Sequence, residues 1–260
     1  MTSELPEYPT GHGLLDGRVV VVTAAAGTGI GFATARRCAE EGATVVLSDH
    51  HARRLEEAAA TIAEEQGRRP LAVVCDVTRE DDVQGLVQAA ADEHGGIDAM
   101  VNNAGLGGTT ELVEMTDEQW RAVLDVTLDG TFRCTRAALR HMLSRDHGVI
   151  VNNASVLGWR GQVGQAHYAA AKAGVMALTR CAALEAAPHG VRVNAVAPSL
   201  ATHPFLSKVI SEDVLADLAQ QEAFGRGAAP WEVANVIVFL ASDYASYMTG
   251  EVVSVSAQHP

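Results

Sequence analysis

A serine, a tyrosine and a lysine stand at a spacing that suits proton transfer. Ser155 precedes Tyr168 by thirteen residues, and Lys172 follows Tyr168 by four. On a helix, residues four apart share one face, so we expect Tyr168 and Lys172 to lie side by side. A phenol titrates at about 10, and a neighbouring cation lowers its pKa. The trio predicts a tyrosine that acts as a general acid or base, although a Tyr–Lys pair taken alone also fits an ordinary surface contact.

A glycine-rich stretch, TAAAGTGIG at residues 23–31, lies between a strand-like run and a helix-like run. Gly27, Gly29 and Gly31 allow the backbone to approach a ligand closely, and the start of the following helix offers unpaired N–H groups to an anion. Phe32 stands where the last glycine of G-x-G-x-x-G would be. The loop predicts a pyrophosphate site, but by itself it is equally consistent with tight packing.

An acidic residue ends the second strand-like run, eighteen residues after Gly31. The Asp49 carboxylate can accept both ribose hydroxyls of an adenosine and would repel a 2′-phosphate, so it favours NAD over NADP. NADP stays an alternative, because the residues that follow could instead meet a 2′-phosphate. They are His50, His51, Arg53 and Arg54.

The elements that must position these residues alternate between strands and helices. Seven short runs rich in β-branched residues are separated by longer stretches of helical period. The runs lie at residues 18–23, 44–48, 71–75, 99–102, 148–153, 191–196 and 251–255. This pattern predicts an α/β fold, a doubly wound parallel seven-stranded sheet with helices on both faces. No repeat, linker or charge block divides the chain, so we expect a single domain over residues 1–260.

Charge and composition argue against several kinds of partner. The formal net charge is −13, whereas nucleic acids and anionic membranes are bound by clustered Lys and Arg. The cysteines have no zinc-finger spacing, so we expect buried reduced thiols and no metal site. They are Cys38, Cys75, Cys134 and Cys181. Residues 1–15 lack a basic leader before an apolar run, and no segment is long enough to span a membrane, so we expect a cytoplasmic protein.

Taken in order, these motifs resemble the short-chain dehydrogenase/reductase family from about Leu15 to the C-terminus. The similarity rests on the glycine loop, the acidic Asp49, the CDV and NNAG motifs, Ser155, the YAAAK pair and the RVNAVAP run. It implies a Rossmann domain that uses NAD or NADP. It also implies interconversion of a secondary alcohol and a ketone by hydride transfer.

The resemblance assigns roles to individual residues. It makes Tyr168 the general acid or base, Ser155 the group that orients the substrate oxygen, and Lys172 the residue that holds the nicotinamide ribose and lowers the tyrosine pKa. The residues it implies in cofactor binding are Ala25, Gly29, Ile30, Gly31, Asp49, Asp76, Val77, Asn103, Ala104, Gly105, Tyr168, Lys172, Pro198 and Thr202.

The sequence also departs from the family pattern. Thr127 stands where an asparagine usually completes the proton relay; its hydroxyl can hold a water but cannot reproduce the two donors of an amide. Ser199 follows Pro198 where a glycine is usual, and the threonine that often touches the carboxamide is either Thr202 or replaced by His203. SVSAQHP replaces an Asp-Gly-Gly ending. These departures indicate a subgroup with its own substrate loop.

The loop at residues 199–226 is predicted to cover the substrate, because it follows the sixth strand at the carboxyl edge of the sheet. The candidate substrate residues are Ser155, Trp159, Arg160, His203 and Phe205. Trp159 and Arg160 fit a core ring and a rim charge equally well.

The combined motifs most resemble bacterial members that oxidise a ring hydroxyl during sterol breakdown, which implies an alicyclic CoA thioester as the substrate. The alternatives are a 3-oxoacyl-thioester reductase and a nucleotide-binding scaffold without catalysis. The stretch at residues 168–187 is small or apolar around its whole circumference, which favours a subunit interface over burial within one domain. Family habit implies a homotetramer.

Overall fold

The computed structural model describes residues 4–202 and 212–257, and these form one seven-stranded sheet. All strand pairs are parallel, in the order β3-β2-β1-β4-β5-β6-β7. The strands are β1 (Val19–Val22), β2 (Thr44–Asp49), β3 (Leu71–Val74), β4 (Ala99–Asn102), β5 (Gly148–Asn153), β6 (Val191–Pro198) and β7 (Val252–Val255). The doubly wound α/β fold predicted from the alternating pattern is therefore confirmed.

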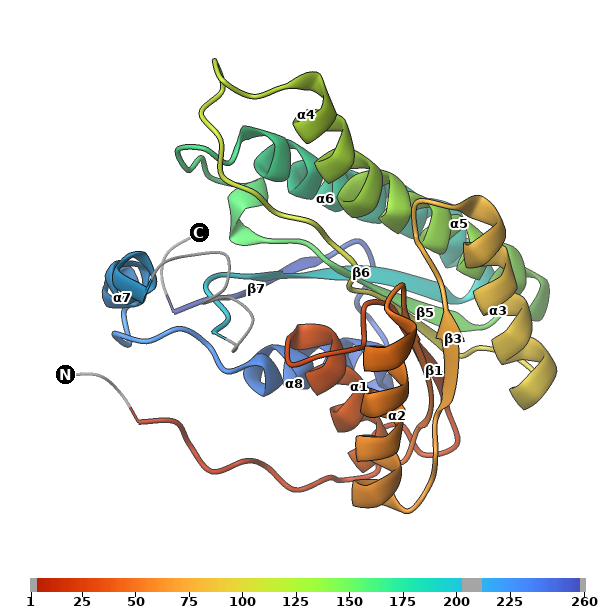
Figure 1. Ribbon diagram of the computed structural model, residues 1–260. Helices are drawn as coiled ribbons and strands as arrows, with labels where there is room; N and C mark the ends of the chain where they lie inside the picture. Colours follow the sequence, from red (N-terminus) through yellow and green to blue (C-terminus); the bar gives the residue numbers. More distant parts are fainter. Residues whose placement is uncertain (1–3, 203–211, 258–260) are drawn as a thin grey trace.

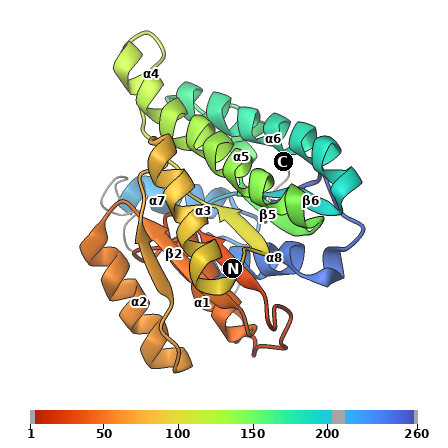
Figure 2. The same cartoon turned by 90° about the vertical axis from the view of Figure 1, so that its right-hand side faces the viewer.

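Helices cover both faces of the sheet, as Figures 1 and 2 show. One layer holds α1 (Ile30–Glu40), α2 (Ala52–Gln66) and α8 (Pro230–Ala241). The other holds α3 (Glu80–His94), α4 (Asp117–Leu124), α5 (Gly130–Met142) and α6 (Ala166–Ala186), and α7 (Glu212–Gln221) lies apart at one end of the sheet. Short turns are η1 (Asp125–Asp129, a π-helix) and the 3₁₀ turns η2 (Leu143–Arg145), η3 (Val156–Gly158), η4 (Ala187–His189) and η6 (Asp243–Ala245). Each layer packs its own cluster of buried aliphatic side chains against the strands.

The strand order reverses between β1 and β4. The chain leaves β1 towards β2 and β3 on one side, then returns to β4 on the other side of β1. Loops after β1 and β4 therefore diverge from neighbouring strand ends, where ligands of doubly wound sheets bind. The loops after β5 and β6 lie along the same carboxyl edge, because those strands are parallel neighbours of β4.

A buried polar ladder ties β4 and β5 to the helices above them. The amide nitrogen of Asn102 donates to the side-chain oxygen of Asn152, 2.8 Å away, and to the hydroxyl of Thr135 on α5 at 3.1 Å. Asn152 in turn donates to the hydroxyl of Thr179 on α6 at 2.9 Å. Buried amides are stable only with such partners, so the ladder fixes α5 and α6 against the strands that carry the candidate site.

An arm at residues 4–14 runs outside the sheet and packs against α1 and α8. The ring of Tyr8 meets Trp231 edge-on, with centroids 5.3 Å apart. Arg37, which is 4% exposed, donates to the carbonyl oxygens of Pro9 and Thr10 and pairs with the buried Glu41. The resemblance in sequence begins after this arm, so these contacts were not foreseen.

Three of the four cysteines are buried, as expected, but Cys181 is exposed. It lies on the outer side of α6, where Leu184 is also 78% exposed. The expectation of a buried thiol was wrong at this position, because the outer side of α6 is not covered by its own chain. No helix among the described residues is long and apolar enough to span a membrane.

Candidate active site

The glycine loop after β1 is fastened to the loop after β4. A β-carbon at position 31 would collide with the carbonyl oxygen of Ala24 and the amide nitrogen of Asn103, so only glycine fits there. The same Asn103 nitrogen donates to the carbonyl oxygens of Thr23 and Ala24, both at 3.2 Å. The predicted cofactor residues Gly31 and Asn103 are thus brought together from strands β1 and β4.

The start of α1 has no side-chain cap. Gly29, at its N-cap, provides no side-chain cap, and the first turn contains no acidic residue. Gly27 adopts a φ of 110°, and no atom lies within 4 Å of the position its β-carbon would take. An uncapped helix start beside such a cradle fits a diphosphate. Ala25 is fully buried, and its N–H donates to the carbonyl oxygen of Ser48, so that N–H is not part of the cradle.

Asp49 ends β2 beside this loop, where the ribose was predicted. One carboxylate oxygen accepts from the backbone N–H of Ala26 at 3.3 Å, and the other accepts from that of His51 at 2.9 Å. Burial raises the pKa of Asp49, and the nearby His50 partly offsets the rise. Arg53 pairs instead with Glu57, and its side chain is 85% exposed, so it lies in solvent near the start of α2.

Asp76 follows β3, and its side chain is shaped by Thr78. One carboxylate oxygen accepts from both the backbone N–H and the hydroxyl of Thr78, at 2.9 and 2.8 Å. Burial pushes the pKa of Asp76 upward, but these two hydrogen bonds and nearby cations outweigh it and leave the pKa below its ordinary value. Val77 is buried, and its carbonyl oxygen accepts from Arg133 at 3.2 Å. An ionised Asp76 is the form that accepts from an amino group.

The three residues of the predicted catalytic trio meet at the start of α6. Ser155 follows β5 at the N-cap of η3, and its hydroxyl is hydrogen-bonded to Tyr168. Lys172 lies one turn further along α6 and is 2% exposed. Its ammonium group donates to the carbonyl oxygen of Asn153 at 2.5 Å and lies 5.5 Å from the centre of the Tyr168 ring.

The prediction that Lys172 lowers the pKa of Tyr168 is wrong in this structure. Burial raises the pKa of Tyr168 to about 12, and the hydrogen bond with Ser155 only moderates the rise. Burial also lowers the pKa of Lys172 to about 8. The helical spacing was read correctly, but the ammonium group turns towards Asn153 instead of the phenol. Desolvation then dominates both groups.

Thr127, at the position usually held by asparagine, is fully buried in the π-helical turn η1. Its hydroxyl accepts from the N–H of Leu106 at 2.9 Å and donates to the carbonyl oxygen of the same residue at 3.1 Å. The only hydroxyl proton is therefore engaged with the loop after β4, so Thr127 cannot donate it to a relay water. A β-carbon at Gly105 in that loop would lie 3.6 Å from the Lys172 nitrogen, so Thr127 holds this loop next to the trio.

The asparagine beside the trio has an unfilled hydrogen-bonding capacity. The amide nitrogen of Asn153 donates to the side-chain oxygen of Asn103 at 2.9 Å. Its own side-chain oxygen is buried and has no hydrogen-bond partner among the described residues. A buried acceptor without a donor is costly, so this oxygen can accept a hydrogen bond from an additional polar group.

The predicted substrate residues are only partly described. Trp159 is 40% exposed just past η3, and Arg160 beside it is half-buried. His203 and Phe205 lie outside the described residues. Pro198 is buried at the end of β6, and Thr202 is exposed, with its N–H donating to the carbonyl oxygen of Ala228 at 2.9 Å. The residue before Tyr168, His167, is buried, and its Nδ1 accepts from the tyrosine N–H at 2.9 Å.

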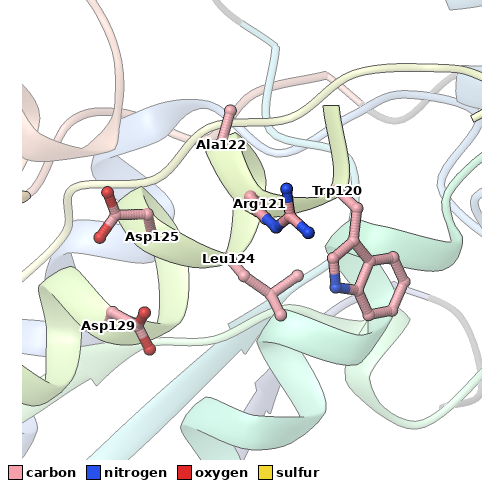
Figure 3. Close-up of a pocket in the computed structure, with 6 residues that line it drawn as sticks. All are labelled: Trp120, Arg121, Ala122, Leu124, Asp125 and Asp129. Atoms are coloured by element: carbon pink, nitrogen blue, oxygen red, sulfur yellow. The ribbon is translucent and has the colours of Figure 1, made fainter. Parts of the chain in front are cut away.

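A surface depression of about 420 Å³ lies elsewhere, over α4 and η1 (Figure 3). Its lining residues are Trp120, Arg121, Ala122, Leu124, Asp125 and Asp129. None of the predicted site residues lines it, and no sequence motif predicts a site there. We therefore place the chemistry at the trio and not in this depression.

A reversed strand order, an uncapped glycine loop and a Ser–Tyr–Lys cluster at one sheet edge are features of a dinucleotide-dependent oxidoreductase. The model of the family described as enoyl-(acyl carrier protein) reductase matches residues 24–257. The chain belongs to the short-chain dehydrogenase/reductase family.

Relatives agree with this placement. The chain is 62% identical, over 99% of both chains, to the (5R,7aS)-5-hydroxy-7a-methyl-1-oxo-2,3,5,6,7,7a-hexahydro-1H-indene-carboxyl-CoA reductase of Mycobacterium tuberculosis. It is 46% identical to the cis-4-hydroxycyclohexanecarboxylate dehydrogenase of Sinomonas cyclohexanicum, over 92% of this chain and 94% of the relative. A crystal structure of a short-chain dehydrogenase from Mycobacterium smegmatis matches with a TM-score of 0.88 and 57% identity, covering 99% of both chains.

Proposed function

We propose that this protein is an NAD(P)-dependent oxidoreductase that interconverts a ring hydroxyl and a ketone on an alicyclic CoA thioester. The observation that carries the proposal is the convergence of Ser155, Tyr168 and Lys172 at the carboxyl edge of the sheet. The substrate class is supported by two relatives, one named for a bicyclic hydroxy-oxo carboxyl-CoA and the other for a hydroxycyclohexanecarboxylate.

The residues around the cradle fit a nicotinamide dinucleotide. The uncapped start of α1 would hold the diphosphate, Asp49 the adenosine ribose, and Lys172 with the unfilled acceptor of Asn153 the nicotinamide half. When bound, the dinucleotide supplies or takes the hydride. We propose NAD as the preferred form, because the Asp49 carboxylate would repel a 2′-phosphate.

The proton is handled by Tyr168. Because burial raises its pKa to about 12, the phenol keeps its proton at neutral pH and can donate it to a ketone oxygen. Ser155, hydrogen-bonded to the phenol, orients the same oxygen. In the opposite direction, Tyr168 must first lose its proton.

A substrate panel tests the proposal. We expect the highest kcat/KM with alicyclic hydroxy- or oxo-carboxyl-CoA thioesters and with NAD(H). The 3-oxoacyl-thioester alternative, which the two named relatives support less, predicts faster turnover of acetoacetyl thioesters with NADPH. A non-catalytic scaffold predicts no turnover of any member of the panel, and the intact trio speaks against it.

We propose that the protein acts as a homo-oligomer, with a tetramer as the expected state, and that it resides in the cytoplasm. The outer side of α6 offers an uncovered apolar strip, including Leu184 and the exposed Cys181. Such a strip is typical of a subunit interface. Sedimentation at micromolar concentration distinguishes a tetramer from a monomer.

A further inference from the structure

Glu222 is a buried carboxylate at the carboxyl edge that the mechanism above does not use. It follows α7 directly, is 4% exposed and has both carboxylate oxygens engaged. One accepts from the hydroxyl of Ser199 at 3.1 Å, and the other accepts from the backbone N–H of Leu200 at 3.4 Å. Residues 199–200 and 222 belong to opposite ends of the predicted substrate loop.

Other contacts fasten the same two ends. Ala201 and Ala228 form a parallel bridge, and the N–H groups of Thr202 and Ala228 donate to the carbonyl oxygens of Ala228 and Leu200 at 2.9 and 2.8 Å. A β-carbon at Gly227 would lie 2.7 Å from the methyl group of Thr202 and 2.9 Å from the Leu200 carbonyl oxygen, so the two chain segments pack tightly. The turn after α7 also meets the end of the chain, because the N–H of Ala223 donates to the carbonyl oxygen of Ala257 at 3.2 Å.

Of these contacts, only those made by Glu222 require a particular side chain. Backbone pairing at residues 200–202 needs no particular residue. Ser199, in contrast, stands where the family resemblance leads one to expect glycine, which could not donate to Glu222. A carboxylate buried beside a serine hydroxyl is retained only where it is satisfied, so the two residues form a matched pair.

The geometry points to Glu222 as a positioning residue for the substrate side of the active site. By holding Ser199 and Leu200, it fixes the path of the chain as it leaves Pro198 at the end of β6, next to β5, the strand that precedes Ser155. The diphosphate and adenosine part of the proposed cofactor site is formed by the loops after β1, β2, β3 and β4 and does not include this pair. This inference rests on the proposed function, since it concerns substrate bound at the same edge.

Kinetics of three variants test it. Glu222→Ala removes both acceptors, and we expect KM for the ring thioester to rise about tenfold or more, as one or two lost hydrogen bonds allow. Dissociation of NADH should change less than threefold. Glu222→Gln should restore most of the loss, because its amide can accept from the Leu200 N–H and donate to the Ser199 oxygen. Ser199→Ala should raise KM about threefold in the wild type and hardly at all in Glu222→Ala.

A matched control separates positioning from general stability. Ser242 is another buried serine; its hydroxyl donates to the Phe239 carbonyl oxygen at 2.8 Å and accepts from the Tyr244 N–H at 3.3 Å, at the far end of α8. Ser242→Ala should cost comparable stability and leave KM unchanged. Hydrogen exchange adds a readout without turnover: the Leu200 amide should exchange faster in Glu222→Ala and remain protected in Glu222→Gln.

The outcomes distinguish the two proposals. If the wild type does not turn over ring thioesters but reduces 3-oxoacyl thioesters, the proposed substrate class is wrong. The same variants then test the role of Glu222 with a 3-oxoacyl thioester as the substrate. If Glu222→Ala folds and keeps the wild-type KM, the positioning role is wrong whatever the exchange rates are. If Glu222→Ala does not fold, Ser199→Ala decides, and an unchanged KM in that variant overturns the inference.

Discussion

Charged side chains at the two edges of the sheet differ in burial and in pairing. At the carboxyl edge, Lys172 is 2% exposed, and burial alone shifts its pKa, with no compensating carboxylate among the described residues. At the amino edge, Arg18 lies 3.1 Å from Asp243 and contacts His147, which lies 3.4 Å from Asp98. The charges at the amino edge are paired and partly solvated, whereas Lys172 at the carboxyl edge is buried and has no carboxylate partner among the described residues.

The difference separates structural charges from chemical ones. A paired surface charge adds little to stability, and its desolvation costs little because it stays partly in water. A buried lysine without an acidic partner lowers stability, and sequences keep such groups where chemistry needs them. The comparison therefore singles out Lys172 without any appeal to a motif, and mutations at the two edges should behave differently.

The largest expected effect is the loss of turnover in Tyr168→Phe. The phenol is the proton donor, and general acid catalysis contributes about 10²–10⁴-fold, so we expect kcat to fall by about 10³-fold or more. NADH binding should stay within threefold, because the ring remains. Steady-state kinetics and a fluorescence titration measure the two quantities.

A tyrosine at the other edge provides the control. Tyr244, in η6, is 76% exposed, and Tyr244→Phe should leave kcat unchanged. An unchanged rate in Tyr168→Phe would remove that residue from the mechanism.

The second prediction concerns stability at Lys172. The pKa of Lys172 is lowered from 10.5 to about 8 in the folded protein, so between these values the unfolded chain binds more protons. Wild-type stability should therefore rise with pH across this window, and below it the buried charge costs about 3 kcal/mol. Lys172→Met removes that cost but leaves the Asn153 carbonyl oxygen without its donor, at about 1 kcal/mol.

At pH 7 we therefore expect Lys172→Met to be inactive yet about 2 kcal/mol more stable than the wild type. The advantage should shrink as the pH rises above 8 and disappear near pH 10, where the remaining cost of deprotonating the lysine on folding equals that of the lost hydrogen bond. Urea unfolding of both proteins at the two pH values measures the difference. If Lys172→Met were less stable than the wild type at pH 7, the buried charge of Lys172 would not be destabilising, and the proposed difference between the two edges would be wrong.

The fold was predictable because its signals are local. Each buried parallel strand is a short β-branched run, and the seven predicted runs match the seven strands to within one or two residues. The relative placement of Tyr168 and Lys172 was predictable for the same reason, since they lie one helical turn apart on α6. The placement of Asp49 was predictable because it ends a strand-like run.

What the sequence did not predict depends on pairings between distant residues. Glu222 meets Ser199, Tyr8 meets Trp231, and Asn102 meets Asn152, and none of these pairs follows a period or a motif. The rise in the pKa of Tyr168 was also missed, because desolvation depends on packing that spacing does not reveal. The direction in which a long side chain points has to be read from the structure.

The third prediction concerns cofactor choice at Asp49. We expect the wild type to prefer NAD over NADP by about tenfold or more in kcat/KM, because a buried carboxylate repels a 2′-phosphate. Asp49→Ala should lower kcat/KM for NAD and so reduce the NAD-to-NADP ratio of kcat/KM about tenfold. The kcat at saturating NAD should change little. A wild type that prefers NADP tenfold would show that our interpretation of Asp49 is wrong. Arg53→Ala is the control, because its side chain is exposed and paired with Glu57.

The smallest expected effect lies at the amino edge. Asp243→Asn removes the carboxylate that faces Arg18, but the Asp243 side chain is 85% exposed, so water replaces most of the interaction. Exposed pairs of this kind contribute about 0–1 kcal/mol, and we expect a loss below about 0.5 kcal/mol, reduced further by salt, with unchanged kcat/KM. Urea unfolding at low and high ionic strength, with kinetics on the same preparations, measures this. If Asp243→Asn lost as much stability as Lys172→Met gains, the amino edge would depend on its charges as strongly as the carboxyl edge, and burial would no longer explain why the two edges differ.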